Sequence, residues 1–433
     1  MGEHRSAQNR QSALLVGVSL SARSAWEAEE SLNELGRLAA TATLVEGGRV
    51  LQTRRQIDPA YYIGKGKAAE LKAQARAAAV DMIVFDNDLS PAQMRNLEEL
   101  TDQRILDRSA LILDIFSRHA RTRTAQIQVE LAQLNYLLPR LTRQWTHLSR
   151  QAGGGAIRGM GAAGVRGPGE TQLETDRRMI RKRIRDLSAK LERIGTQMAT
   201  SRKGRSDTFK IALVGYTNAG KSTLMRSLSG AQVLVQDQLF ATLDSTTRSV
   251  DLDQHHKILL TDTVGFIRHL PHHLFASFRA TLEEAVEADL LLHVVDLSHP
   301  HYALQMETCT EVLRELNLQE KPTLLVYNKI DRVGPGEESQ IAAGHADQKD
   351  AVAVAALTGF GLEALKERIL ELCLANSIVV DLQIPQQEGR LLSQLHAQGQ
   401  ILEEHYRDNE VCLRVRLDRN QADRWQLQRF EFN

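Results

Sequence analysis

Residues 215–222 have the composition and spacing of a phosphate-binding loop. They read Gly-Tyr-Thr-Asn-Ala-Gly-Lys-Ser and match the Walker A pattern, between an apolar run at 211–214 and a helical pattern that begins at Ser222. The backbone N–H groups of such a loop and the N-terminus of the next helix attract phosphate oxygens. The pattern predicts that Lys221 reaches the β- and γ-phosphates of a nucleotide and that the Ser222 hydroxyl binds Mg²⁺. A glycine-rich turn that only joins a strand to a helix is the alternative.

Residues 259–265 carry a second group with nucleotide chemistry. An apolar run ends in Asp262, and Gly265 follows three residues later. Asp262 is placed to hold Mg²⁺ directly or through water, and the Gly265 N–H can sense a γ-phosphate because glycine lets the backbone approach closely. Phe266 stands where Ras-like enzymes have a glutamine that orients water, which a phenyl ring cannot do. We therefore expect slow intrinsic hydrolysis, with the missing group supplied by a partner or by a rearranged loop.

Basic residues just after Phe266 are weaker candidates for the missing group. Each is more readily explained as an exposed loop residue. They are Arg268, His269, His272, His273 and Arg279.

Residues 240–248 offer a hydroxyl for the same metal ion. They read Phe-Ala-Thr-Leu-Asp-Ser-Thr-Thr-Arg. In a GTPase, a threonine in this region completes the Mg²⁺ shell while the γ-phosphate is present and leaves after hydrolysis. Thr242 is our choice for this ligand, ahead of Thr246 and Thr247.

Residues 328–331 read Asn-Lys-Ile-Asp and follow an apolar strand pattern at 324–327. This resembles the guanine-recognition motif of the GTPase superfamily. An Asp carboxylate can accept both the N1–H and the exocyclic N2–H₂ of guanine, a pair that adenine does not offer. Residues 352–359 resemble the last element of such sites, with Ala355 at the usual Ser position. The motif predicts GTP rather than ATP, with base contacts from backbone N–H groups near Ala355 and weaker support for that loop.

The sequence thus predicts one nucleotide site built from five segments. Lys221 and Gly265 are the predicted catalytic residues, and Ser222 and Thr242 are the predicted Mg²⁺ ligands. The nucleotide-binding candidates are Gly215, Tyr216, Thr217, Asn218, Ala219, Gly220, Lys221, Ser222, Phe240, Ala241, Thr242, Leu243, Asp244, Asp262, Thr263, Val264, Gly265, Asn328, Lys329, Ile330, Asp331, Ala355, Ala356 and Leu357.

The bulk composition indicates an ordinary globular chain. It has 433 residues, 42% of them apolar, and a formal net charge of zero. The chain contains no apolar stretch of about 18 residues, so we expect no transmembrane helix. Three separated cysteines, with no Cys-x-x-Cys spacing, predict neither a disulfide framework nor a zinc site. We expect a cytoplasmic monomer, with peripheral membrane association left open.

The charge is unevenly distributed along the chain. Residues 104–205 contain 21 Lys and Arg against 8 Asp and Glu, a net charge of +13. Within this segment, residues 153–169 contain eight glycines and two arginines and cannot form a core. A solvated helical face and a passive linker are the alternatives, but the charge favours a basic segment that becomes ordered on nucleic acid.

Hydrophobic periodicity predicts an α/β multidomain fold. Strand and helix patterns alternate in residues 1–105, which we expect to form a small α/β domain with a parallel sheet. Residues 106–206 are expected to form a basic helical hairpin, with helices at 125–138 and 175–198, that carries the glycine-rich loop. Residues 207–375 are expected to form a doubly wound P-loop GTPase domain, and residues 376–433 a small α+β domain.

Taken together, these motifs resemble the HflX family of the Obg–HflX GTPase group over almost the whole chain. Beyond the nucleotide motifs, the resemblance rests on three segments. These are Tyr-Tyr-Ile-Gly-Lys-Gly-Lys at 61–67, Asp-Arg-Ser at 107–109 leading to 114–121, and Gly-Pro-Gly-Glu-Thr-Gln-Leu-Glu at 167–174. The family also has a hydrophobic residue at the position of Phe266.

The resemblance implies a GTPase that binds the large ribosomal subunit and splits or rescues stalled ribosomes under stress. It implies that the amino-terminal part contacts rRNA and that the ribosome stimulates hydrolysis. It also implies that some members bind ATP through the amino-terminal domain, for which Gly64 to Lys67 are candidates. A basic helix start near rRNA is the alternative for those residues. For the whole chain, the alternative is an RNA-binding ribosome-assembly factor that uses GTP as a conformational switch.

Overall fold

The chain forms two compact units in a computed structural model. The first unit comprises Met1–Ser201, Val235–Ser245 and Thr263–Glu283. The second comprises Arg202–Leu234, Thr246–Asp262 and Glu284–Asn433. The structure describes residues 11–20, 25–141, 172–202, 208–230, 239–240, 242–253, 256–268, 284–333, 350–375, 377–407, 409–418, 422 and 425–432.

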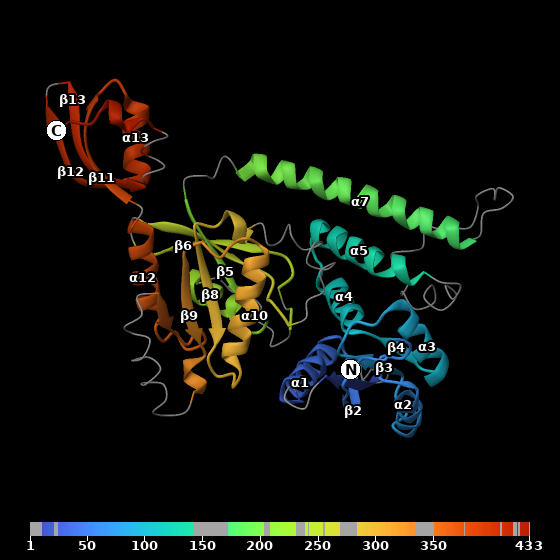
Figure 1. Ribbon diagram of the computed structural model, residues 1–433. Helices are drawn as coiled ribbons and strands as arrows, with labels where there is room; N and C mark the ends of the chain where they lie inside the picture. The colour runs from blue at the N-terminus through green and yellow to red at the C-terminus, as the bar shows by residue number, and fades with distance from the viewer. Residues whose placement is uncertain are drawn as a thin grey trace, which may run out of the picture. The chain divides into compact units, whose positions relative to one another are not determined.

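The first unit contains the expected parallel α/β sheet. Its strands lie in the order β2-β1-β3-β4, and all neighbours pair in parallel. Apolar side chains of β1 and β3 are buried beneath α2 and α3 in one continuous core. Figure 1 shows these helices around the sheet. The bounds are β1 Ser12–Ser19, α1 Ala25–Thr41, β2 Val45–Thr53, α2 Lys65–Ala77, β3 Met82–Phe85, α3 Pro91–Thr101, β4 Arg104–Leu106 and α4 Arg108–His119.

Two helices in the same unit form the predicted hairpin. They are α5, Arg123–Leu137, which ends in the 3₁₀ turn η2, Leu138–Arg140, and α7, Gln172–Arg202. Contacts pair Glu130 with Arg183 and Leu141 with Arg177, so the helices run antiparallel. Their shared apolar core contains Ile127, Leu131, Leu134, Ile184, Leu187, Leu191 and Ile194.

One residue of the predicted apolar stripe of the hairpin lies outside that core. Met179 belongs to the helical spacing of 175–198, yet 39% of it is exposed, since its neighbour Ile180 takes the inward position on α7. The glycine-rich stretch at 153–169 lies outside the described residues.

The second unit contains a six-stranded sheet in the order β10-β9-β8-β5-β7-β6. Every pair is parallel except β6 with β7, which is antiparallel. Ligand sites of such sheets form at the carboxyl ends of the strands, where the predicted motifs stand. The bounds are β5 Phe209–Gly215, α8 Lys221–Ser229, β6 Thr246–Asp251, β7 Lys257–Asp262, β8 Leu290–Asp296, α10 Tyr302–Glu315, β9 Thr323–Asn328, η4 Ile330–Arg332, β10 Ala351–Ala353 and α12 Leu362–Ala375.

The end of the chain folds as a small antiparallel sheet with one helix. It comprises β11 Ser377–Pro385, α13 Gly389–Gln398, β12 Gln400–Arg407 and β13 Glu410–Asp418, in the sheet order β11-β13-β12. The edge strand β12 was not predicted from the sequence, because its exposed Glu, His and Tyr residues break the alternation. Leu427 is fully buried, and Trp425 and Phe430 pack against the same core.

Candidate nucleotide site

Two glycines of the loop at 215–220 have backbone conformations that exclude larger residues. Gly215 has φ +146°, and a Cβ there would lie 2.2 Å from the carbonyl oxygen of Val294. Gly220 has φ +97°, and a Cβ there would lie 2.2 Å from the side-chain amide of Asn328. A methyl group at either position would push the loop away from its neighbours. The Walker A glycines therefore allow close packing of the loop against β8 and β9.

Lys221 is the first residue of α8 and is buried within the loop. Its Nζ donates hydrogen bonds to the carbonyl oxygens of Gly215, at 3.0 Å, and Tyr216, at 2.9 Å. Burial lowers the pKa of Lys221, while the nearby Asp262 carboxylate acts in the opposite direction. The ammonium group is thus held against the backbone of the loop by two carbonyl oxygens. A negatively charged phosphate oxygen would be a stronger hydrogen-bond acceptor than either carbonyl.

Ser222 and Asp262 bring two oxygen ligands together. The Ser222 hydroxyl donates to Oδ2 of Asp262 at 2.6 Å, and Asp262 is almost fully buried at the end of β7. Hydroxyl and carboxylate oxygens are the donors that Mg²⁺ prefers. The donor set therefore fits the predicted metal ion.

Asn328 connects three loops of this site. Its Nδ2 donates to the carbonyl oxygen of Ala219 at 2.9 Å, and its Oδ1 accepts the N–H of Ala356 at 3.0 Å. The side chain is 2% exposed. The phosphate loop, the Asn-Lys-Ile-Asp segment and the segment at 355–357 are thus tied together by one amide group.

Lys329 adds a second connection. Its Nζ donates to the carbonyl oxygen of Asn218 at 2.8 Å and pairs with Asp296 at 2.7 Å. Lys329 adopts φ +63°, and the short helix η4 that follows places Asp331 on an exposed turn. Sequence reasoning missed Asp296, although an Asp directly after the apolar strand at 290–295 was a usable signal.

The segment at 355–357 is supported without the usual Ser. Ala355 and Ala356 are buried, while Leu357 is 67% exposed. The Ser227 hydroxyl of α8 donates to the carbonyl oxygen of Ala356 at 2.5 Å. Together with Asn328, Ser227 gives the loop the side-chain support that Ala355 cannot provide. No local sequence pattern indicates this role of Ser227, because it lies 129 residues from its partner.

The remaining predicted residues belong to the first unit. They lie in the two segments predicted to respond to the γ-phosphate, which we call the switch segments. The described residues of these segments are 239–240 with 242–245, and 263–268. Thr263, Val264 and Phe266 are buried there, as are Phe240 and Leu243. Ala241, His269, His272, His273 and Arg279 lie outside the described residues.

Arg268 differs from the expectation of an exposed loop residue. Its side chain is 15% exposed and forms an ion pair with Glu27 at 3.7 Å. The pairing partner comes from α1, more than two hundred residues earlier, so a local reading of the sequence could not reveal it.

The residues around Gly64 line a separate pocket of about 450 Å³ in the first unit. Its walls include Arg54, Lys65 and Lys67, and the Arg54 guanidinium binds the carbonyl oxygen of Ile63. The basic walls agree with the sequence pattern, but ATP binding there stays a prediction.

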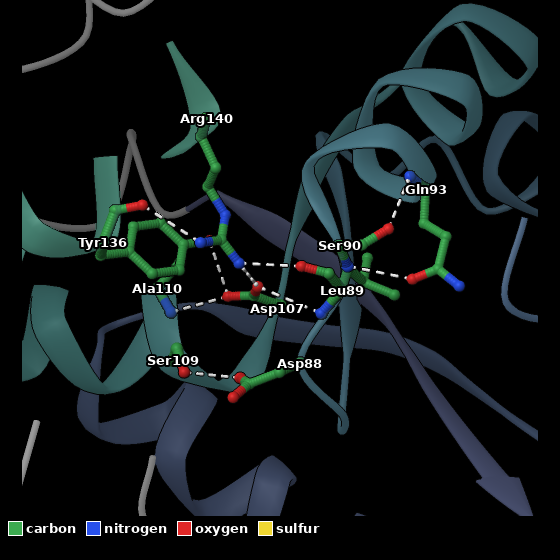
Figure 2. Close-up of polar contacts among 9 residues, drawn as sticks. All are labelled: Asp88, Leu89, Ser90, Gln93, Asp107, Ser109, Ala110, Tyr136 and Arg140. Atoms are coloured by element: carbon green, nitrogen blue, oxygen red, sulfur yellow. Dashed lines mark hydrogen bonds and ion pairs between the residues drawn. The ribbon is translucent and has the colours of Figure 1, made fainter. Parts of the chain in front are cut away.

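A buried polar network joins the sheet of the first unit to the hairpin. Asp107 accepts hydrogen bonds from the Tyr136 hydroxyl at 2.8 Å, from Arg140 at 3.0 Å and from the N–H of Ala110 at 2.9 Å (Figure 2). The Arg140 guanidinium also lies over the Tyr136 ring and donates to the carbonyl oxygen of Leu89 at 2.8 Å. Burial raises the pKa of Asp107, while Arg140 opposes that shift. The network holds the end of α5 against the start of α4.

Three family models match successive segments of this chain. The family described as "GTP-binding GTPase N-terminal" matches residues 29–117, "GTP-binding GTPase Middle Region" matches residues 119–205, and "50S ribosome-binding GTPase" matches residues 210–329. A solved structure of a GTP-binding protein from Sulfolobus solfataricus, in complex with GDP, is 24% identical. It covers 84% of this chain and 98% of its own length, with a TM-score of 0.43.

Curated relatives share much more sequence. The GTPase HflX of Escherichia coli (strain K12) is 44% identical over 392 residues, which cover 90% of each chain. The GTPase HflX of Magnetococcus marinus is 44% identical over 388 residues, which cover 89% of this chain and 88% of the relative. With its phosphate loop, its guanine motif and this similarity along nearly its full length, the chain belongs to the HflX family of GTPases.

Proposed function

We propose that this GTPase binds the large ribosomal subunit through its basic hairpin and splits or rescues stalled ribosomes under stress. The observation that carries the proposal is the exposed basic face of α7, in a chain that also holds a complete phosphate loop. Arg178, Arg181, Lys182 and Arg185 recur at helical spacing and are exposed, on the side of α7 opposite its apolar contacts with α5. Such a face attracts the phosphates of rRNA.

The proposed division of labour follows the four segments expected from the sequence. Residues 1–105 and 106–206 contact the ribosome, residues 207–375 bind and hydrolyse GTP, and residues 376–433 form an accessory module. Support comes from the sheet boundaries and from the matched family segments. Relatives named HflX and the ribosome-binding description of the matched family agree with a ribosomal partner.

The proposed chemistry is in-line attack of water on the γ-phosphate. Lys221 and the N–H groups of residues 215–222 would stabilise the developing negative charge, and Gly265 would contact the γ-phosphate. Ser222 and Thr242 would hold Mg²⁺, which would neutralise charge on the phosphate oxygens, and Asp262 would support this set. Asp331 would select guanine, with backbone N–H groups of residues 355–357 against the base.

Phe266 bears on the rate of this reaction. Its side chain is 2% exposed, and a phenyl group has no donor or acceptor for a water molecule. The proposal therefore includes slow turnover by the isolated protein and completion of the site by the ribosome.

The test is GTP turnover with and without purified large subunits at fixed salt. We expect strong stimulation in the wild-type protein and no turnover in Lys221→Ala. Equal turnover with and without subunits would contradict a site completed by the ribosome. Co-sedimentation with mature and precursor subunits provides the second readout. Binding to precursors alone would favour the assembly-factor alternative.

A further inference from the structure

The segment at 355–359, which lies wholly in the second unit, leaves one backbone donor free. Four of its five N–H groups donate hydrogen bonds of 2.9–3.1 Å, namely those of Ala355, Ala356, Thr358 and Gly359. The N–H of Leu357 has no acceptor among the described residues, and Leu357 is 67% exposed. A donor in this state is available to a ligand.

The Ser227 hydroxyl holds the peptide group that carries this donor. It donates to the carbonyl oxygen of Ala356 at 2.5 Å. A serine within a helix commonly bonds a carbonyl of the preceding turn, whereas Ser227 bonds a loop outside its own helix. The C=O and the N–H of a trans peptide group point in opposite directions, so the N–H of Leu357 points away from α8.

Helix α8 is a firm support for this bond. Its residues Leu224 and Leu228 are buried in the same apolar core as Ala356. The helix also begins at Lys221, the lysine of the phosphate loop. One helix therefore places the ammonium group for the phosphates and sets the direction of the free N–H of Leu357.

Guanine and adenine carry opposite hydrogen-bonding groups at position 6 of the purine ring. The 6-oxo group of guanine accepts a hydrogen bond, whereas the 6-amino group of adenine donates one. A fixed N–H at Leu357 suits the 6-oxo group alone. If the peptide group turned over, the carbonyl oxygen of Ala356 would take the place of that N–H and would accept a 6-amino group instead.

We propose that Ser227 is a positioning residue for guanine selection. It keeps the N–H of Leu357 directed at the 6-oxo group of the base and prevents the peptide group from turning over. Asp331 then reads positions 1 and 2 of the purine, and the peptide group held by Ser227 reads position 6. This inference rests on the proposed contact between the base and the N–H groups of residues 355–357.

The first experiment compares the affinities of the full-length protein for GDP and 6-thioguanosine diphosphate, with Mg²⁺ at pH 7. The analogue differs only at position 6, where sulfur is a weaker hydrogen-bond acceptor than oxygen. The wild-type protein should prefer GDP. In Ser227→Ala, the affinity for GDP should fall about 5-fold and that for the analogue should fall less, so the preference should shrink by about 3-fold.

Ser229→Ala is the matched control. Ser229 lies on the same helix, and its buried hydroxyl has no hydrogen-bond partner within the part of the chain that the structure describes. We expect the wild-type preference for GDP in Ser229→Ala and also in Ser227→Thr, which keeps a hydroxyl at position 227. Circular dichroism checks that each variant is folded.

The outcomes separate the inference from the proposed function. An equal fall in affinity for both diphosphates in Ser227→Ala would overturn the inference, because a general loosening of the loop does not depend on the atom at position 6. Unchanged affinities in Ser227→Ala would overturn it as well. If the wild-type protein binds both diphosphates equally well, the proposed contact between backbone and base fails, and the inference fails with it.

The second experiment tests the turned-over peptide group with 2,6-diaminopurine riboside diphosphate. This nucleotide keeps the 2-amino group of guanine and has an amino group at position 6. Without the Ser227 hydroxyl, the carbonyl oxygen of Ala356 is free to accept that amino group. Relative to GDP, the affinity for the diaminopurine nucleotide should therefore rise in Ser227→Ala and stay at the wild-type value in Ser229→Ala. The same ratio in all three proteins would contradict the role assigned to Ser227.

Discussion

The side chain of Asn328 holds separate loops of this site together. Its amide uses a donor and an acceptor to connect the phosphate loop with the segment at 355–357. Both groups are buried, so loss of either bond would leave an unsatisfied polar atom, which typically costs about 1–3 kcal/mol. Asn328 therefore has a structural role, and under the proposed function the exposed Asp331 recognises the base.

The role of Asp331 can be tested by exchanging its carboxylate for an amide. In Asp331→Asn, one acceptor becomes a donor, which no longer suits the N1–H and N2–H₂ of guanine but suits the 2-oxo group of xanthine. We expect GTP affinity to fall on the order of 100-fold and XTP affinity to rise. Competition binding with GTP, XTP and ATP measures this change. A variant that loses all three nucleotides would indicate a structural role for Asp331 instead.

His293 gives a pH-dependent prediction at the same scale. It lies within β8, is 4% exposed, and burial together with the Lys221 charge lowers its pKa from 6.5 to about 4. Above pH 6.5 it is neutral in both folded and unfolded chains. As the pH falls from 6.5 towards 4, the unfolded chain binds a proton first, and the fold loses roughly 3 kcal/mol at most.

Denaturant unfolding at pH 7 and at pH 4.5 checks this prediction. The loss of stability between these pH values should shrink in His293→Leu, whatever the stability of that variant at pH 7. His405→Leu, at an exposed position on β12, is the control and should keep the wild-type slope. Parallel pH profiles for the wild type and His293→Leu would refute the assignment.

At the scale of elements, buried polar groups determine how α5, the first helix of the hairpin, packs against the amino-terminal α/β elements. Asp107 caps α4 through the N–H of Ala110 and also receives Tyr136 and Arg140 from α5 and η2. A second buried carboxylate, Asp86, pairs with Arg108 in the same region at 2.6 Å. Because buried charges need fully matched partners, these groups leave few alternative placements for α5.

The contribution of this network is measurable through Tyr136. Tyr136→Phe removes one donor to the buried Asp107 carboxylate. The loss should weaken the packing of α5 against α4 by about 1–2 kcal/mol. Amides of α5 should then exchange roughly 10-fold faster with solvent. Tyr61→Phe, in the core of the same unit, is the control and should have a smaller effect. Unchanged amide exchange in Tyr136→Phe would show that Arg140 alone holds α5 against α4.

At the scale of the whole molecule, the zero net charge conceals separate basic and acidic parts. The +13 of residues 104–205 is balanced by the remainder of the chain. In the described part of α7, Arg183 forms an ion pair with Glu130 at 2.7 Å. The outer basic face is suited to a polyanion, and its affinity should fall steeply with salt. Among the described residues, no helix is long and apolar enough to cross a bilayer.

The salt dependence of RNA binding tests the basic face. Arg181→Ala with Lys182→Ala removes two exposed charges, so the slope of log affinity against log salt should fall by about 1.5. Arg390→Ala with Arg429→Ala makes the same charge change in exposed residues of the carboxy-terminal sheet domain and should leave the slope unchanged. GTP binding should be normal in both. Equal slopes for the two double variants would place RNA elsewhere on the chain.

The sequence by itself determined the local parts of this protein. The phosphate loop, the Asn-Lys-Ile-Asp motif, the alternating strands and helices and the apolar stripes of the hairpin depend on neighbours a few residues apart. The spacing of these residues can therefore be recognised in the amino-acid sequence alone. The short strand β4, the buried α4 and the polar strand β12 were missed, since none of them has a clear period of its own.

Only the tertiary structure decided which distant residues meet. Ser227 supports the carbonyl of Ala356, Asp296 pairs with Lys329, and Asp244 caps α5 beside Thr122. The same holds for the switch segments, whose described residues belong to the amino-terminal unit although they are flanked by strands of the GTPase sheet. These contacts join residues tens to more than a hundred positions apart. The chain closes such long loops only when the whole core forms, so no local pattern records them.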